Sequence, residues 1–392
     1  MTLIFGVFCV LGVLMDAFQT IISPRRATGP VRLTRLFYIA TWNPWAFLAR
    51  RIPDPRRRET AFSFYGPLSL ILLLACWAAV ILFGFGLVFH GIGSPFFDNR
   101  QHPGFWSDLY LSGTAIFTMG PTDAGPINQA ARWLMVMESG IGFAFLAIVM
   151  GYFPVLYGAF SRREVSISLL DARAGSPPTA AELMRRHAHD GAEEALVTLL
   201  IEWERWSAEL LESHISFPLL CYFRSQHTNQ SWISALTAIL DTCALTIAGV
   251  RGHEARQAQL TFAMARHAMV DLSQVVSQKP VLNAPDRLPH ERYNQLYGVL
   301  CQGGVSMCRD GEAEKRLMDM RRLYEPYAEA LSAYFHMPLP PWIAEHPHKD
   351  NWLTVAKVRA GAEVANPENR DPGVRGEQVA AVRMLEEEHH EF

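Results

Sequence analysis

The sequence has little charge for its length. Only 19% of its 392 residues are Asp, Glu, Lys or Arg, whereas soluble domains contain nearer to about 25%. The charge is also uneven, because the first 160 residues carry 11 basic and 7 acidic side chains and the remaining 232 carry 24 and 31. Two stretches before Phe160 are long enough to span a bilayer and hold almost no charge, which excludes a small soluble enzyme. No block is basic enough to predict binding to nucleic acid.

Cysteine is also sparse, and patterns typical of catalytic or metal sites are missing. Six cysteines in 392 residues exclude a secreted scaffold held by disulfides. The sequence contains no His-Glu-x-x-His, no Cys-x-x-Cys and no glycine-rich phosphate loop after a strand. We therefore expect no enzyme, no bound metal and no organic cofactor. We interpret Cys301 and Cys308 as reduced core thiols.

Three long apolar segments account for the low charge. A helix needs roughly 20 apolar residues to cross the hydrocarbon core, and residues 3–22, 64–92 and 133–160 are long enough. Only a helix satisfies its backbone hydrogen bonds within one such segment, so three transmembrane helices are expected. The first segment lacks a basic front and a cleavage site, which indicates an uncleaved anchor.

Arginine residues predict the orientation of these helices. Nine lie between residues 23 and 63, only two lie between residues 93 and 132, and Arg162 and Arg163 follow the third span. We therefore expect the N-terminus and the second loop outside and the C-terminal part in the cytoplasm. Residues 23–63 also hold several aromatic side chains. This mixture suits either a helix lying in the inner membrane interface or a loop folded against the cytoplasmic domain.

The loop between the second and third spans is too apolar for an ordinary connector. Residues 105–117 would form about three helical turns, too few to cross the membrane, and so indicate a re-entrant helix within residues 104–126. Pro121 would end this helix. The carbonyls at its C-terminal end carry partial negative charge and therefore favour a cation.

The order of span, re-entrant helix, Thr-x-Gly, Asp, Pro and span resembles the pore module of two-transmembrane potassium channels. Their filter reads Thr-x-Gly-(Tyr/Phe/Leu)-Gly-Asp-x-x-Pro, and this sequence matches it at Thr118, Gly120, Asp123 and Pro126. The resemblance covers residues 64–160. It implies a homotetramer around one pore, in which permeant K⁺ or another monovalent cation passes a filter of Thr118, Met119, Gly120, Pro121, Thr122 and Asp123.

The filter departs from the family pattern at two positions. Pro121 stands in place of the aromatic residue and Thr122 in place of the second glycine. Glycine adopts left-handed backbone conformations without strain, whereas the β-branched Thr122 resists them and Pro121 has no N–H. We expect fewer coordinating carbonyls, and hence relaxed discrimination between K⁺ and Na⁺ or poor conduction. The alternative is a non-conducting membrane sensor or scaffold with a channel-like fold.

Several further residues are candidates for roles beside the filter. Asp123 would concentrate cations at the pore mouth or only hold the loop. Thr114 would brace the filter through its hydroxyl or simply pack. Glu138 would brace the filter from behind, face the cavity or lie in the wet outer interface. Gating-hinge candidates in the third span, with close packing as the other role for the glycines, are Gly140, Gly142 and Pro154.

The C-terminal part is predicted to be mainly helical. Thr179 and Glu182 form a capping box that opens a helix to about residue 214. Further helices are expected over residues 230–249, 253–278, 289–301 and 311–335, with Pro326 bending or splitting the last. The only strand-like alternation covers residues 165–169. A polar and aromatic group forms either a ligand site or a set of satisfied buried residues: Ser213, His214, Arg224, His227 and Trp232.

The prediction is an all-α membrane protein whose partners are membrane lipid and monovalent cations. An anchor (1–22) and a basic interfacial segment (23–63) precede the potassium-channel-like pore module (64–160). A cytoplasmic α-helical domain (161–363), coupled to the pore through residues 161–170, would gate it, and a flexible acidic tail (364–392) follows. The stretch 168–178 is similar to bacterial proteins described as potassium-channel-like, which implies the bacterial inner membrane.

Overall fold

The computed structural model describes residues 1–22, 33–94, 96–98, 104–120, 124–188, 193–225, 229–249, 253–305 and 311–344. The chain divides into two units, Met1–Glu345 and His346–Phe392. The second unit, with the predicted acidic tail, lies outside the described residues. The described part of the first unit is mostly helical, and its regular structure includes one pair of short strands.

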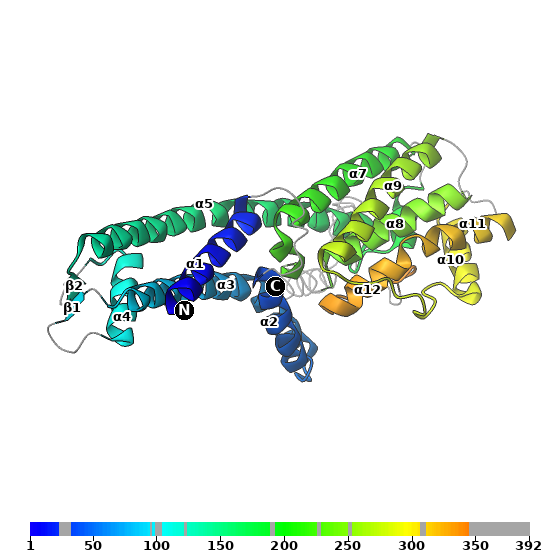
Figure 1. The fold of residues 1–392 in the computed structure, drawn as a ribbon. Helices are drawn as coiled ribbons and strands as arrows, with labels where there is room; N and C mark the ends of the chain where they lie inside the picture. Colours follow the sequence, from blue (N-terminus) through cyan, green and yellow to red (C-terminus); the bar gives the residue numbers. More distant parts are fainter. Residues whose placement is uncertain are drawn as a thin grey trace, which may run out of the picture. The chain divides into compact units, whose positions relative to one another are not determined.

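The three predicted spans are helices, and two of them are longer than expected. Helix α1 (Thr2–Ala17) continues into the π-helical turn η1 (Phe18–Ile22), while α3 covers Pro55–Gly91 and α5 covers Gln129–Ala174. By length and composition these helices are apolar enough to cross a membrane. Helix α1 lies beside α3 (Figure 1). A Cβ at Gly6 would lie 2.5 Å from the Gly84 carbonyl oxygen, so small residues allow this close approach.

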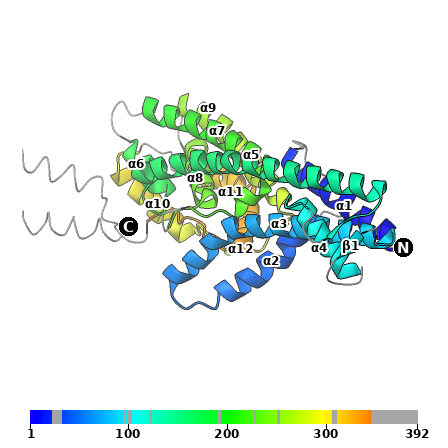
Figure 2. The same cartoon turned by 90° about the vertical axis from the view of Figure 1, so that its left-hand side faces the viewer.

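Helix α2 (Leu33–Ala49) forms a helical hairpin with the first turns of α3 (Figure 2). One face of α2 is buried, and the Trp42 indole N–H donates to the Tyr334 carbonyl at 3.1 Å in the C-terminal bundle. Its other face exposes apolar side chains, Leu36, Ile39, Phe47 and Leu48 among them. Residues 33–49 therefore form a helix that packs against the bundle with one face and carries an exposed apolar face.

The re-entrant segment is helix α4 (Phe105–Ile116), and it packs against both α3 and α5. Two strands flank it, β1 (Phe96–Asp98) and β2 (Ala124–Pro126). They pair antiparallel, with Phe96 opposite Pro126 and Asp98 opposite Ala124. The helix was predicted from its apolar composition. The strand pair was not, because three residues are too few to show alternation.

The C-terminal bundle follows the predicted helix order with two corrections. The helix expected from residue 179 to 214 is divided into α6 (Ala180–Arg186) and α7 (Glu193–Ser216), and Asp190-Gly191 between them is a turn signal. Thr179 Oγ1 caps α6 by accepting from the Glu182 N–H at 3.2 Å. Residues 165–169 are helical and belong to α5, because the helix of the third span continues through them.

The remaining bundle elements match their predicted positions closely, except η2, a short 3-10 helix that was not predicted. They are η2 (Pro218–Tyr222), α8 (Trp232–Gly249), α9 (His253–Val275), α10 (His290–Gln302), α11 (Gly311–Arg322) and α12 (Glu325–Phe335). Pro326 stands at the start of α12, so the expected helix over 311–335 is split there.

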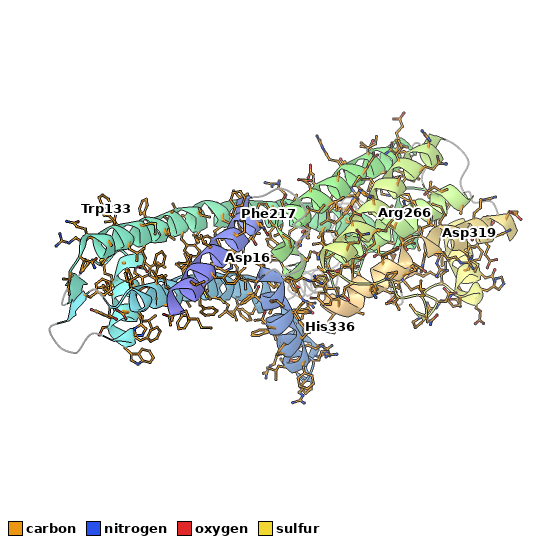
Figure 3. All side chains as sticks on the ribbon, in the orientation of Figure 1. Asp16, Trp133, Phe217, Arg266, Asp319 and His336 are labelled. Carbon is orange, nitrogen blue, oxygen red and sulfur yellow. The ribbon has the colours of Figure 1, made fainter. Side chains whose placement is uncertain are left out.

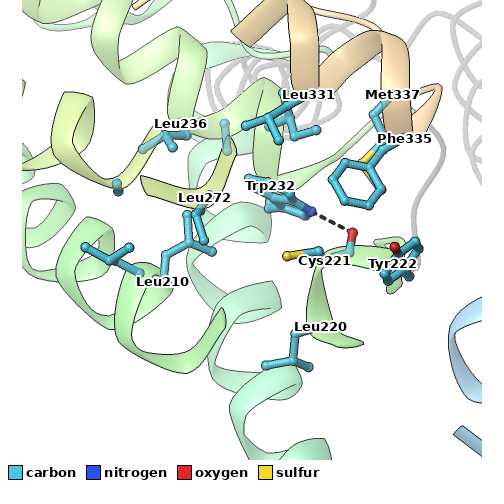
Figure 4. Packing of buried hydrophobic residues seen from close by; sticks show 14 of the residues in the cluster. Leu210, Leu220, Cys221, Tyr222, Trp232, Leu236, Leu272, Leu331, Phe335 and Met337 are labelled. Carbon is cyan, nitrogen blue, oxygen red and sulfur yellow. Dashed lines mark hydrogen bonds between the residues drawn. The ribbon is translucent and has the colours of Figure 1, made fainter. Parts of the chain in front are cut away.

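Helix α8 forms the centre of the bundle. It is apolar enough to cross a membrane, yet 94% of it is buried by other bundle elements. Its Trp232 indole N–H donates to the Cys221 carbonyl at 3.3 Å among packed leucines and Phe335 (Figure 4). Burial raises the pKa of the Cys221 thiol to about 12. Asp241 at its midpoint lies 2.7 Å from Arg287 and accepts from the Tyr324 hydroxyl at 2.5 Å, so the buried charge is compensated.

One cysteine prediction was wrong. Cys301 is exposed near the end of α10 and is not part of the core, while Cys308 lies outside the described residues. The two cysteines stand seven positions apart, and this spacing does not indicate which face of α10 is buried.

Candidate functional site

The candidate site is the C-terminal end of α4 and the residues that follow it. Glycines on both neighbouring spans let α4 approach closely. A Cβ at Gly86 on α3 would lie 3.0 Å from Leu109 Cδ1, and a Cβ at Gly142 on α5 would lie 2.0 Å from the Ile116 carbonyl oxygen. Gly142 is thus required for contact between α5 and the end of the re-entrant helix.

The backbone after α4 has two left-handed residues at alternate positions. The φ angle is 56° at Thr118 and 76° at Gly120. Glycine adopts this conformation freely, but a β-branched residue such as Thr118 rarely does, which marks a constrained segment. The amides of Met119 and Gly120 both point back to the Thr114 carbonyl, at 2.8 Å and 3.3 Å. The remaining predicted filter residues, Pro121, Thr122 and Asp123, lie outside the described residues.

Thr114 supports this segment, though not through its hydroxyl. The hydroxyl donates to the Leu111 carbonyl within α4 at 2.8 Å, and the side chain is buried. Its carbonyl instead accepts from the two amides after the helix. Residues 119 and 120 are therefore held by the backbone carbonyl of Thr114. Every residue has such a carbonyl, so the sequence does not single out Thr114 for this contact.

Glu138 is buried behind α4. Its side chain has no exposed surface, and Oε1 lies 2.5 Å from Ser112 Oγ. Ser112 Oγ also lies 2.9 Å from the Leu82 carbonyl, so one serine connects α3, α4 and α5. The second carboxyl oxygen of Glu138 is buried and has no hydrogen-bond partner. Glu138 therefore contacts α4 at Ser112 and is not exposed to water within the single chain.

A second buried carboxyl group stands at the other end of α4 and was missed in the sequence. Asp108 lies in the first helical turn, where a negative charge complements the helix dipole. Its Oδ2 accepts from the Ser94 hydroxyl at 2.7 Å and lies 3.0 Å from His90 Nδ1. The signal was available, because Asp108 is the one carboxylate in the apolar loop helix and His90 stands at the exit of the preceding span.

The hinge candidates lie along one uninterrupted helix. A Cβ at Gly140 would meet nothing within 4 Å, whereas Gly142 packs against α4. Pro154 lies inside α5, which stays helical on both sides of it. The outward face of this span is apolar and exposed within the single chain, as Trp133 illustrates in Figure 3, with Phe143, Leu146, Met150 and Phe153 further along.

Asp16 connects the anchor helix to the rest of the membrane region. It is 5% exposed, and its Oδ2 accepts from the Thr34 hydroxyl at 2.6 Å and from the Thr34 amide at 3.1 Å. The Trp77 indole N–H donates to the same oxygen at 3.1 Å. A single carboxylate therefore ties α1, α2 and α3 together where they meet (Figure 3).

Arg163 connects the third span to the bundle. It is buried, and its guanidinium donates to the Leu220 carbonyl at 2.9 Å and to the Phe223 carbonyl at 2.8 Å. Its Nη1 also lies 3.2 Å from His214 Nε2. His214 Nδ1 lies 2.8 Å from the Leu210 carbonyl, which only accepts, so Nδ1 carries the proton and Nε2 accepts from Arg163.

The predicted polar and aromatic group does not converge on one ligand site. His214 packs near Trp232, with ring centroids 5.4 Å apart, and is satisfied by Arg163 and the backbone. Burial and the charge of Arg163 hold the pKa of His214 well below its usual value, so it is neutral. Arg224 points elsewhere, donating to Glu59 at 2.6 Å and to the Phe335 carbonyl at 2.6 Å. His227 lies outside the described residues.

Comparisons with known proteins support membrane placement. No family model matches the chain, and no solved structure matches it. The chain is 25% identical over 249 residues to a protein of Bacillus subtilis (strain 168) described as uncharacterized membrane protein YdjJ. The similar region covers 62% of this chain and 69% of that protein. Together with the long apolar helices, this similarity makes the chain a membrane protein.

Proposed function

We propose that this protein is a homotetrameric cation channel of the bacterial inner membrane, with a pore resembling that of potassium channels. The observation that carries the proposal is the placement of α4. It is a short helix between two spanning helices, and it ends in a constrained segment with left-handed residues at Thr118 and Gly120. The proposed orientation has the N-terminus outside and the bundle in the cytoplasm, because the arginines gather on that side.

The electrostatics of α4 favour a cation at its C-terminal end. A helix carries roughly half a negative charge there, and Asp108 at the opposite end complements the positive pole. The carbonyls of residues 118–120 follow directly, and backbone carbonyls replace the hydration shell of ions in selectivity filters. Asp123, by sequence the first carboxylate after them, would attract cations to the pore mouth.

The exposed surface of the single chain supports assembly around a pore. The most apolar window of α5 is only 17% buried, against 39% for that of α3. Phe117 and Met119, beside the filter segment, are 63% and 70% exposed. One chain supplies one re-entrant helix, and a ring of four closes a filter of this kind without leaving open interfaces.

The proposed filter has relaxed selectivity. The segment up to Gly120 can present carbonyls, but Pro121 has no amide hydrogen and Thr122 resists a further left-handed turn. Fewer ring positions would then coordinate the ion than in a complete potassium filter, which weakens discrimination between K⁺ and Na⁺. The bundle would gate this pore through Arg163, because that residue joins α5 to η2 and α7.

The test is cation flux through the purified full chain in liposomes, with K⁺ and Na⁺ gradients measured separately. Thr118→Ala and Asp123→Asn should both lower flux, and the exposed bundle variants Thr198→Ala and Asp319→Asn are matched controls for the same chemical changes. The proposal is supported if the wild type passes K⁺ and Na⁺ at comparable rates and if only Thr118→Ala and Asp123→Asn lower this flux. Strict K⁺ selectivity would contradict the relaxed filter, and flux insensitive to Thr118 would contradict the assigned pore.

Pro121 and Thr122 also favour a second candidate, a non-conducting sensor or scaffold that keeps the channel-like arrangement. The double change Pro121→Tyr with Thr122→Gly restores the family filter and separates the two. In a relaxed channel the double variant should pass K⁺ in preference to Na⁺. Folded tetramers of both wild-type and double variant that pass no ion would favour the scaffold.

A further inference from the structure

A cavity of about 720 Å³ lies where the membrane helices meet the bundle, and we call it the bundle-side cavity. Its walls come from η1, α2, α3, α5, the C-terminal end of α7, η2, the C-terminal end of α9 with the residues that follow, and α12. Its volume falls within the range of roughly 300–1,000 Å³ that is usual for small-molecule sites. None of the proposed pore residues lines it.

The two sides of the cavity differ in chemistry. The α3 side is apolar, and from Leu70 to Trp77 it follows that transmembrane helix for roughly 10 Å at 1.5 Å per residue. The lining from α2 and the bundle adds hydrogen-bonding side chains, such as Asn43, Gln274 and Gln278, next to apolar ones such as Ile39 and Leu219. A ligand that satisfies both sides has an apolar chain and a polar head.

The charge of the lining indicates the sign of that head. Arg35 is the one ionisable group among the lining residues that is charged near neutral pH, and no carboxylate lines the cavity. Within the described part of the chain, Arg35 is exposed and makes no ion pair. The carboxylate of Asp16 contacts two lining residues from behind, but it is buried and already accepts from Thr34 and Trp77.

We propose that the bundle-side cavity binds one phospholipid with an anionic headgroup, taken from the leaflet that adjoins the bundle. The acyl chain would lie along α3 and the headgroup would meet Arg35 and the amide side chains. Such a lipid contacts α2, α3 and α9 at once, so it joins membrane and bundle. The inference requires a membrane protein and does not depend on ion conduction.

Native mass spectrometry of the purified full chain in nonionic detergent tests this site. Phosphatidylglycerol and phosphatidylcholine with identical acyl chains are added at limiting concentration, and bound lipid is counted per chain. We expect phosphatidylglycerol to be retained in preference. Arg35→Gln should lower its occupancy about tenfold, the order expected for one charge-assisted hydrogen bond.

Arg50→Gln is the matched control, since Arg50 is exposed just beyond the other end of α2 and does not line the cavity. The amount of phosphatidylglycerol bound to this variant should equal the amount bound to the wild type. Gln274→Trp narrows the cavity from the bundle side and should lower binding of both lipids. Soluble glycerol 1-phosphate should displace neither, because it has no acyl chain.

Four outcomes would overturn the proposal. An equal loss of bound phosphatidylglycerol in the Arg35 and Arg50 variants would show that the protein's general surface charge, and not the cavity, causes the preference. Equal retention of the two lipids by the wild type would remove the anionic preference. Unchanged binding in the Gln274 variant would place the lipid elsewhere, and displacement by glycerol 1-phosphate would make the ligand a soluble phosphate compound.

Discussion

Ser112 of α4 and Glu138 of α5 are joined by a contact in which Ser112 Oγ lies 2.5 Å from Glu138 Oε1 and neither side chain is exposed. The pair fixes the re-entrant helix α4 to the span α5. Because a carboxyl group in a membrane interior is costly unless it is hydrogen-bonded, the position of α4 depends on this contact.

Ser112→Ala should therefore destabilise the protein. The substitution removes the hydrogen-bond partner of Oε1 and leaves a buried carboxyl oxygen unsatisfied, which costs about 1–3 kcal/mol. The measurement is the thermal unfolding midpoint in one detergent. Ser168→Ala, at an exposed position of the same helix α5 as Glu138, is the control and should leave the midpoint unchanged. Equal midpoints for all three proteins would show that the pair contributes nothing.

Gly142→Ala and Gly140→Ala form a second matched pair. A methyl group at residue 142 would collide with the Ile116 carbonyl, whereas one at residue 140 meets open space. We expect the first variant to lose flux and thermal stability. The second should gain up to about 1 kcal/mol, because alanine favours a helix interior over glycine. Purified protein of each variant is compared by unfolding midpoint and flux, and a tolerated methyl at residue 142 would refute the close packing.

His214 predicts a pH dependence of stability. Burial and the charge of Arg163 lower its pKa in the folded protein, so protons bind more readily to the unfolded chain. The stability present above pH about 6.5 should be lost progressively as the pH falls below that value, by at most about 1.4 kcal/mol per unit for this group.

His214→Gln tests the assignment, because glutamine does not titrate and can both donate and accept. Unfolding midpoints of wild type and variant are compared between pH 8 and pH 5.5. The unfolding midpoint should fall less with decreasing pH in the variant than in the wild type. His336, whose pKa is also lowered by burial, is present in both proteins and cancels in the comparison. If the midpoints of both proteins fall by the same amount over this pH range, groups other than His214 cause the acid sensitivity.

Arg224→Gln should loosen the contact between the start of α3 and the bundle. Arg224 is 8% exposed and donates to Glu59 and to the Phe335 carbonyl. Glu59 is 42% exposed and stays solvated without its partner, so the main cost is the unsatisfied buried carbonyl, about 1–3 kcal/mol. Arg205→Gln breaks the exposed pair with Glu209, which is worth about 0–1 kcal/mol. Denaturant or thermal unfolding should separate the two variants clearly, and similar midpoints would contradict the role given to Arg224.

Local chemistry in the sequence was sufficient to predict most of the helices, but not every boundary, the short elements or the contacts between helices. The three spans, α4 and the cap at Thr179 follow from composition and spacing. Two features were not predicted: the division between α6 and α7, and the helical conformation of residues 165–169. Each depends on whether a neighbouring helix continues through the segment.

At the candidate site, the sequence identified Glu138 as significant without its partner. Ser112 is 26 residues away and carries no distinguishing pattern, so only the packing of α4 against α5 reveals the pair. Thr114 illustrates the same point, since its carbonyl and not its hydroxyl holds Met119. Tertiary hydrogen bonds of this kind depend on the fold as a whole.

Helix α5 has a mechanical consequence. Its 46 residues rise roughly 70 Å, about twice the thickness of a hydrocarbon core, and no break occurs at Pro154. A rigid helix of this length would act as a lever, with its fulcrum at the close contact of Gly142 with Ile116. The arm to Arg163 is roughly 30 Å and the arm to Gln129 roughly 20 Å. A sideways displacement of the bundle would therefore reappear at the Gln129 end of α5 reversed in direction and reduced by about one third.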